Sequence, residues 1–227
     1  SFIKENLNLN LPLSSKKVLI TAGPTQEKID NVRYISNYSS GKMGIALSKV
    51  AAELGANVKL ILGPTNHSII HSNIEIVNVL SADHMYDRVL ANFSSTDIII
   101  CAAAVSDFKP KNPVKNKIKK QTGFDKIELV PNKDILLEIS KKKSTSQILI
   151  GFALESDNEI NNAISKLKNK NLDFVVLNST NDKAAGFSVD TNKITIIDSD
   201  SNIEEFKVKS KYNVSKDIFN KILKIKK

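Results

Sequence analysis

Short apolar runs alternate with amphipathic segments along most of this chain, and this alternation constrains the fold more than any other feature. The run at residues 97–105 (DIIICAAAV) is apolar after its first residue, which is typical of a central parallel strand covered by helices on both faces. Further strands are predicted at 16–22, 57–62, 74–80, 127–130, 147–153 and 174–178. Helices are predicted between them at 41–54, 81–93, 133–141 and 159–169. This pattern predicts an α/β fold, a doubly wound, mostly parallel Rossmann-like sheet with helices on both faces.

Three helix ends carry recognisable signals in the sequence. Gly55 directly follows the helix predicted at 41–54 and is suited to its C-terminal cap. Ser81 and Asn132 precede two other helices, and both residue types are preferred N-caps.

The C-terminal part departs from the strand–helix alternation. Strands at 193–198 and 205–209 flank a polar DSDSN turn and predict a hairpin, and a last helix begins near residue 212. The polar residues 1–15 are predicted to be a tail or linker. Residues 16–227 are then a single domain.

Several protein classes are excluded by composition. The longest apolar stretch has eight residues (98–105), whereas a membrane span needs about 20. The opening SFIKENLNLNLPLSSKK lacks the apolar core of a signal peptide. One cysteine and three histidines exclude a disulfide framework and a Cys/His zinc cage, and Cys101 is predicted to be an inert core thiol. We therefore expect a soluble, cytoplasmic protein with no membrane partner.

The chain is basic, with 33 Lys and Arg against 24 Asp and Glu and a net charge of +9. Six of the lysines lie in residues 108–121, which contain no acid. A nucleic-acid-binding module is one hypothesis for such a patch, but Phe108 is its only aromatic residue, and single-strand binders stack bases on several. The charge therefore favours small anionic ligands over nucleic acid.

A Rossmann-type nucleotide-cofactor oxidoreductase is the second alternative that the fold suggests. Its G-x-G-x-x-G fingerprint would continue from Gly23 with glycines at 25 and 28, where the chain has Thr25 and Lys28. A P-loop is also excluded, because Met43 follows Gly41 and Lys42 in place of Ser or Thr.

An anion site is instead predicted where the polar segment GPTQEKIDNVRYISNYSSGKMG brings Ser40 and Gly41 to a helix start. Backbone N–H groups and the positive helix end bind anions there. Ligands of open α/β sheets lie beyond the carboxyl ends of the strands, where residues 106–107, Asn132 and residues 152–156 also emerge. The sequence therefore predicts a cationic site with one or two acids.

Seven motifs follow one another along the chain: GPTQEKIDNVRYISNYSSGKMG, AAAVSDFKP, KIKKQ, VPNKDI, GFALES, KNKNLDFVVLN and GFSVDTN. In this order they make the chain similar to the phosphopantothenoylcysteine synthetase family. The resemblance runs from about residue 16 to near the C-terminus. The KIKK motif resembles the bacterial, CTP-using type, which is often fused behind a flavin-dependent decarboxylase domain. A chain that begins at Ser1 is expected to be a piece of such a fusion.

The resemblance implies a phosphopantothenate–cysteine ligase of coenzyme A synthesis. The carboxylate of 4′-phosphopantothenate would attack the α-phosphorus of CTP to give an acyl-cytidylate and pyrophosphate, and cysteine would then displace CMP. It also implies Mg²⁺ on the triphosphate, with no metal ligands assigned, and a homodimer.

Site residues follow from the resemblance position by position. The implied catalytic residues are Asn37, Arg33 and Lys117. The implied nucleotide-binding residues are Ser40, Gly41, Ala102, Ala103, Asp107, Lys117, Asn132, Lys133, Phe152, Lys166 and Lys170.

From the residues alone, structural roles remain open for the catalytic candidates. Asn37 could cap the helix that follows it, and Arg33 could pair with Asp30 or Glu27 on the surface. Lys117 could belong to a solvated loop.

Overall fold

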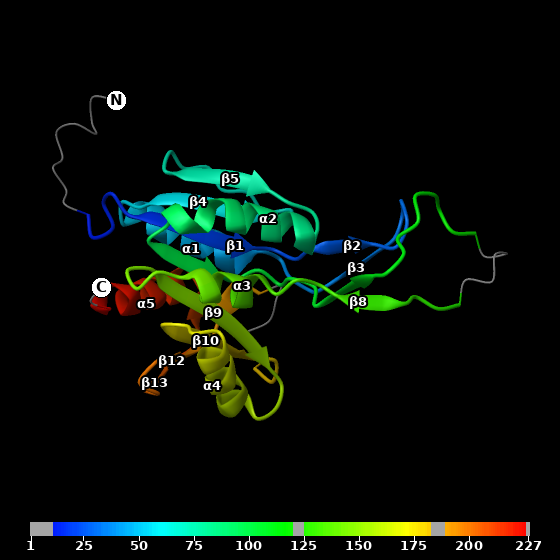
Figure 1. Cartoon of the computed structure of the whole chain (residues 1–227). Helices are drawn as coiled ribbons and strands as arrows, with labels where there is room; N and C mark the ends of the chain where they lie inside the picture. Colours follow the sequence, from blue (N-terminus) through cyan, green and yellow to red (C-terminus); the bar gives the residue numbers. More distant parts are fainter. Residues whose placement is uncertain (1–10, 120–124, 183–188, 226–227) are drawn as a thin grey trace.

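The computed structural model describes residues 11–119, 125–182 and 189–225 of the chain. Eight strands form one sheet in the spatial order β13-β12-β10-β9-β6-β1-β4-β5 (Figure 1). The parallel strands are β1 (Lys17–Ala22), β4 (Asn57–Leu62), β5 (Ile74–Asn78), β6 (Ile98–Cys101), β9 (Ile148–Glu155) and β10 (Phe174–Ser179). Numbered along the chain, these strands have the order 3-2-1-4-5-6, which is that of the Rossmann fold. The predicted doubly wound sheet is confirmed.

Helices cover both faces of this sheet. The helices α1 (Lys42–Glu53) and α5 (Lys211–Lys224) lie on one face, and α2 (Ala82–Asn92), α3 (Ile135–Lys142) and α4 (Glu159–Asn169) lie on the other. Within β1, Val18 and Ile20 belong to the first core and Leu19 to the second. Both kinds of position are buried, and this explains why the strand shows no polar alternation.

The predicted C-terminal hairpin is present at the edge of the sheet. It consists of β12 (Thr195–Asp198), antiparallel to β10, and β13 (Ile203–Glu205). Its second strand begins two residues earlier than the predicted 205–209. Part of the predicted strand instead forms β14 (Lys209–Ser210), which pairs with β11 (Thr191–Asn192).

Two of the three predicted helix ends are confirmed. The Ser81 side chain accepts a hydrogen bond from the His84 N–H, and Gly55 follows α1 at φ +95°, a conformation that favours glycine. The prediction of Asn132 as the cap of α3 is wrong. Asp134 caps this helix by accepting from the Leu137 N–H at 2.8 Å, while the Asn132 amide donates to the Ser106 carbonyl.

Two strand predictions are corrected at the carboxyl edge of the sheet. The strand expected at 127–130 does not join the sheet, because β8 (Leu129–Pro131) pairs with β7 (Phe108–Pro110). The strand expected at 97–105 ends at Cys101. Beyond it the backbone stays bonded to the β1 side, for example from the Ala104 N–H to the Gly23 carbonyl at 2.9 Å.

An arm projects from this edge of the sheet, on the right of Figure 1. It comprises the hairpin β2 (Gln26–Lys28) and β3 (Tyr34–Ser36), the pair β7–β8, and residues 111–119. The arm therefore has its root where β1 and β6 end.

The N-terminal boundary also differs from the predicted tail at 1–15. Leu13 is 3% exposed in the first core, and its N–H donates to the Leu54 carbonyl, so residues 11–15 pack against the end of α1. Residues 1–10 lie outside the described residues. In the described part of the chain, no helix combines the length and apolarity that crossing a bilayer requires.

Candidate active site

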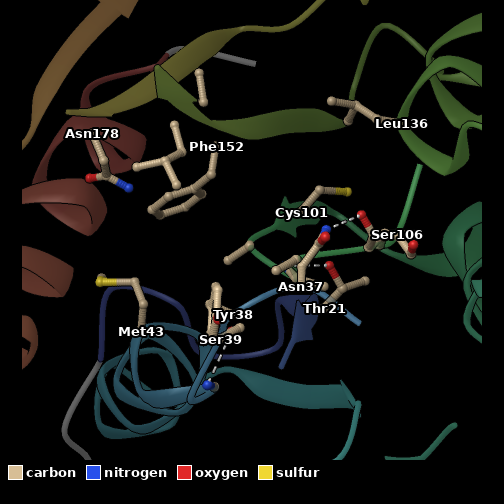
Figure 2. A pocket seen from close by; sticks show the side chains of 18 of the residues that line it. Thr21, Asn37, Tyr38, Ser39, Met43, Cys101, Ser106, Leu136, Phe152 and Asn178 are labelled. Atoms are coloured by element: carbon tan, nitrogen blue, oxygen red, sulfur yellow. Dashed lines mark hydrogen bonds between the residues drawn. The ribbon is translucent and has the colours of Figure 1, made fainter. Parts of the chain in front are cut away.

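A cavity of about 790 Å³ lies at the carboxyl ends of β1, β6, β9 and β10. Thr21, Cys101, Phe152 and Asn178 line it from these four strands, as Figure 2 shows. This is the point at which the strand order reverses, where open α/β sheets bind their ligands. The cavity therefore has the position predicted from the sequence.

Most of the predicted site residues meet in this cavity. Eleven of the thirteen line it, namely Asn37, Ser40, Gly41, Ala102, Ala103, Asp107, Asn132, Lys133, Phe152, Lys166 and Lys170. Arg33 and Lys117 do not line it and lie in the arm.

The N-terminus of α1 forms one wall of the cavity. Gly41 is the N-cap residue at φ +75° and so has no side chain to cap the helix, and the first turn contains no acid. The helix can begin here because Gly44 packs on β1: a Cβ at this position would lie 2.3 Å from the Ala22 Cβ. An uncapped, positive helix end beside a cavity is suited to binding phosphate.

Lys166 of α4 and Lys170, which directly follows this helix, line the other side of the cavity. The Lys166 ammonium donates to the Phe152 carbonyl at 2.7 Å, and burial holds its pKa below the usual value despite the nearby Glu155 and Asp134 carboxylates. The Lys170 ammonium forms an ion pair with Asp134. Burial opposes ionisation of Asp134, but hydrogen bonds from Lys170 and the Leu137 N–H outweigh it and lower the Asp134 pKa.

Three further cations approach the cavity but are held by protein groups. The Lys133 ammonium lies 4.6 Å from the centre of the Tyr86 ring. Lys42 forms an ion pair with Asp190 at 2.7 Å. Lys211 is 8% exposed, donates to the Val189 and Thr191 carbonyls at 2.5 and 2.9 Å, and has a pKa lowered by burial and by Lys42.

Asn37 and Asn132 hold the segment that follows β6. The Asn37 amide donates to the Val105 carbonyl at 2.9 Å, so the alternative that Asn37 caps α1 is wrong. The Asn132 amide donates to the Ser106 carbonyl at 2.8 Å, and its backbone N–H donates to the Asp107 carbonyl. Among the described residues, the Asn132 Oδ1 atom is buried without a hydrogen-bond partner.

Backbone groups and one carboxylate remain available to a ligand here. The N–H groups of Ala102 and Ala103 donate to the Thr21 carbonyl and hydroxyl, so recognition at these alanines falls to their carbonyl oxygens. Within the described residues the Asp107 carboxylate has neither a hydrogen bond nor an ion pair. The residues described contain no cluster of three or more metal-ligating side chains.

Some residues of the cavity were not predicted. Thr21 and Asn178 belong to the carboxyl ends of β1 and β10, so the rule used for the other strands could have found them. Asn192 donates to Asn178 Oδ1 at 3.1 Å, and Lys211 begins α5. Both come from the C-terminal part of the chain, where no sequence signal links them to the strand ends.

Arg33 and Lys117 both lie in the arm, and Arg33 contacts the residue that follows Lys117. Arg33 Nη2 lies 3.1 Å from Asp30 Oδ2 and donates to the Ile118 carbonyl at 2.6 Å, so the ion pair with Asp30 is confirmed. Glu27 is occupied elsewhere, because it accepts from the Ala82 N–H. Lys117 is exposed, and Lys120 and Gln121 of the basic run lie outside the described residues.

Known proteins resemble this chain over nearly its whole length. The profile of the DFP family, described as the DNA/pantothenate metabolism flavoprotein C-terminal domain, matches residues 13–225. A cysteine/cysteine sulfinic acid decarboxylase from an unknown prokaryotic organism is 49% identical over 98% of this chain and 62% of its own length. The coenzyme A biosynthesis bifunctional protein CoaBC of Bacillus subtilis is 44% identical over 95% of this chain and 53% of its own. The chain thus spans little more than half the length of these relatives.

Solved structures share the fold. The C-terminal domain of a coenzyme A biosynthesis bifunctional protein CoaBC superposes with a TM-score of 0.80 at 37% identity, covering 94% of this chain and 97% of that domain. A Cab2 variant in complex with phosphopantothenate-cysteine has a TM-score of 0.71 at 18% identity, over 97% of this chain and 89% of that one, and shows the fold alone.

Proposed function

Because the chain belongs to the DNA/pantothenate metabolism flavoprotein C-terminal domain family, we propose that it is a phosphopantothenate–cysteine ligase driven by the cleavage of CTP to CMP and pyrophosphate. The observation that carries the proposal is the cavity at the strand-order reversal, with the N-terminus of α1 on one side and Lys166 and Lys170 on the other. Every substrate of this reaction except cysteine carries a net negative charge, and such a cavity attracts anions.

The two steps of the reaction place different demands on the cavity. Attack of the 4′-phosphopantothenate carboxylate on the α-phosphorus of CTP needs alignment and charge neutralisation, which the α1 N-terminus, Lys166 and Lys170 would supply. The Asn37 amide would then hold the acyl-cytidylate while the cysteine amine displaces CMP. Carbonyl oxygens of Ala102 and Ala103 would accept from the amino group of cytosine, and Phe152 would pack against the nucleotide.

Mg²⁺ would neutralise charge on the triphosphate and so ease departure of pyrophosphate. The donor set fits a metal that arrives with its nucleotide, since Mg²⁺ usually keeps several waters and takes one or two carboxylates. The Asp107 carboxylate, which has no partner in the described chain, is suited either to this ion or to the ribose hydroxyls.

A homodimer would complete the site. Lys117 and Arg33 do not line the cavity of their own chain, and the arm that carries them projects from the same edge of the sheet. Large apolar side chains are exposed along this arm, between 45% and 57%: Val32, Tyr34, Phe108, Val114 and Leu129. A second copy of the chain that covers them would place Lys117 in the neighbouring cavity, where it would bind the triphosphate or the departing pyrophosphate.

The native protein is expected to be larger than the ligase domain. The curated relatives are longer, and we propose that a flavin-dependent decarboxylase domain is fused to or assembled with the ligase domain. This ligase domain comprises residues 16–227 together with residues 11–15, which pack against it. We place the protein in the cytoplasm. The decarboxylation named for the first relative would belong to that additional part.

The ligase reaction is tested with the purified chain, 4′-phosphopantothenate, CTP, Mg²⁺ and cysteine. CMP and pyrophosphate should form in equal amounts, and omission of phosphopantothenate should abolish both. Parallel reactions with ATP measure nucleotide preference. Absence of nucleotide cleavage with any triphosphate would refute the proposal, and titrations with nicotinamide cofactors and with generic DNA would then examine the two alternative classes.

The shared site is tested by mixing two inactive variants, Asn37→Ala and Lys117→Ala. If Lys117 acts in the neighbouring subunit, each mixed dimer holds one intact site, and random exchange restores about a quarter of the original turnover. If Lys117 acts within its own chain, mixing restores nothing.

A further inference from the structure

Asp30 is a buried carboxylate at the turn between β2 and β3, in the arm. It is 2% exposed, whereas the neighbouring Val32 is 57% exposed. A buried charge is tolerated only when other groups compensate it, so the partners of Asp30 indicate what this residue does.

The two carboxylate oxygens of Asp30 have different partners. Oδ1 accepts from the Val32 and Arg33 N–H groups, each at 2.8 Å, and so forms the local turn. Oδ2 accepts from the Ile118 N–H at 3.1 Å and lies 3.1 Å from Arg33 Nη2. One oxygen therefore shapes the hairpin, and the other reaches across to residues 111–119.

Ile118 is held on both of its backbone groups. Its N–H donates to Asp30, and its carbonyl accepts from Arg33 Nη2 at 2.6 Å. A second bond joins the same two segments, from the Val114 N–H to the Ile29 carbonyl at 2.9 Å. The backbone next to Lys117 is thus attached to the turn through Asp30 and Arg33.

We propose that Asp30 is a positioning residue for the ligase reaction, which fixes the backbone beside Lys117 and the guanidinium of Arg33 in one arrangement. This role rests on the proposed function, because Lys117 and Arg33 reach the substrates only if the chain is a ligase. Burial opposes ionisation of Asp30, but hydrogen bonds from Val32, Ile118 and Arg33 outweigh it and hold the Asp30 pKa below its usual value. The Asp30 carboxylate is therefore charged at neutral pH.

Asp30→Asn distinguishes the role of Oδ2 from that of Oδ1. Its carbonyl oxygen can keep the turn at the Oδ1 position. Its NH₂ group would face the Ile118 N–H and the Arg33 guanidinium and cannot accept from either, so both interactions of Oδ2 are lost. We expect the exchange of the Ile118 amide hydrogen to become at least about tenfold faster, and turnover to fall about 10- to 100-fold because Lys117 is no longer fixed. Asp30→Ser provides a second variant, since its hydroxyl can support the turn but is too short to reach Ile118.

A double-mutant cycle distinguishes positioning from a general structural effect. Asp30→Asn should lower turnover in the original chain but have a smaller effect in the Lys117→Ala chain, because much of its effect acts through Lys117. Lys115→Ala removes a charge from an exposed position of the same segment and should leave turnover unchanged.

Each outcome decides between defined alternatives. Original turnover in Asp30→Asn, or a loss that multiplies with that of Lys117→Ala, would overturn the positioning role while the ligase function stands. Loss of cooperative unfolding in both Asp30 variants would show that the residue serves folding and would also overturn the role. If the original chain forms no CMP, the ligase function fails and the catalytic part of this inference with it, although Ile118 exchange still reports whether Asp30 holds the segment.

Discussion

Replacing Gly44 by alanine tests how closely α1 must approach β1 for the cavity to form. The new Cβ would lie 2.3 Å from the Ala22 Cβ, whereas carbon atoms in contact are about 3.5–4.0 Å apart, so the helix must retreat by about 1.5 Å. Overpacking costs about 1–3 kcal/mol, and so short a contact belongs to the upper part of that range, about 2–3 kcal/mol. Alanine regains about 1 kcal/mol through its higher helix propensity. We expect a net loss of about 1–2 kcal/mol, which lowers the melting temperature by about 2–8 °C.

The same shift should impair the reaction, because Gly44 lies in the first turn of α1 and this turn lines the cavity. A displacement of about 1 Å can lower turnover about 100-fold, measured as CMP release. Ala46→Gly in the same helix, at a half-buried position, is the matched control and measures the propensity contribution alone. A melting temperature of Gly44→Ala that is unchanged or raised, with Ala46→Gly lowered as expected, would refute the close-packing argument.

Three further predictions concern single side chains. Lys117→Ala should lower turnover at least about 100-fold with an unchanged melting temperature, because the side chain is exposed, and equal turnover in the original and variant chains would exclude its role. For Asp198, burial is outweighed by hydrogen bonds from Lys221 and Asn202 and the pKa is lowered, so its stabilisation is complete above about pH 4 and is lost as pH falls through the folded-state pKa. Asp198→Asn should therefore lower the free energy of urea unfolding at pH 7 but much less at pH 2, and an equal loss at both would contradict this. Cys101 is half-buried and lines the cavity, and desolvation raises its pKa to about 12, so at pH 8 its thiolate fraction is about a thousandfold smaller than in the unfolded chain. Because a thiolate of higher pKa is more nucleophilic, it should react with an aromatic disulfide about tenfold to a hundredfold more slowly than in the unfolded chain, and similar rates would contradict the raised pKa.

The central strands of the sheet were predictable because they are buried on both faces. Val18, Leu19 and Ile20 all pack in a core, so the run of β-branched and aliphatic residues is visible without any knowledge of neighbours. The same holds for the position of the cavity, since the carboxyl ends of parallel strands necessarily meet at one edge. Ala102 and Phe152 therefore came together although 50 residues separate them in the sequence.

Most of the arm escaped prediction for the opposite reason, and only β8 overlaps a predicted strand, at 127–130. Its four strands have three residues each, and their outer faces are exposed, as Tyr34 and Phe108 are. Periodicity arises from a buried face, so short strands with little burial leave no pattern to detect. The pairing of β7 with β8 depends on contacts across a polar, basic loop that local propensity does not encode.

Neither residue patterns nor the geometry of a single chain places Lys117 in the active site. Its assignment came from resemblance, whereas the geometry leaves it on the arm, outside the cavity that holds Asn37 and Asp107. The resemblance and the geometry agree only if the arm of one copy serves the cavity of another. The apolar side chains exposed on the arm, such as Val32 and Tyr34, then have a physical reason: they are core residues of an interface and not of the domain. Recovery of turnover on mixing the Asn37 and Lys117 variants is the result this arrangement requires, and without that recovery the arm does not serve the cavity of a second copy.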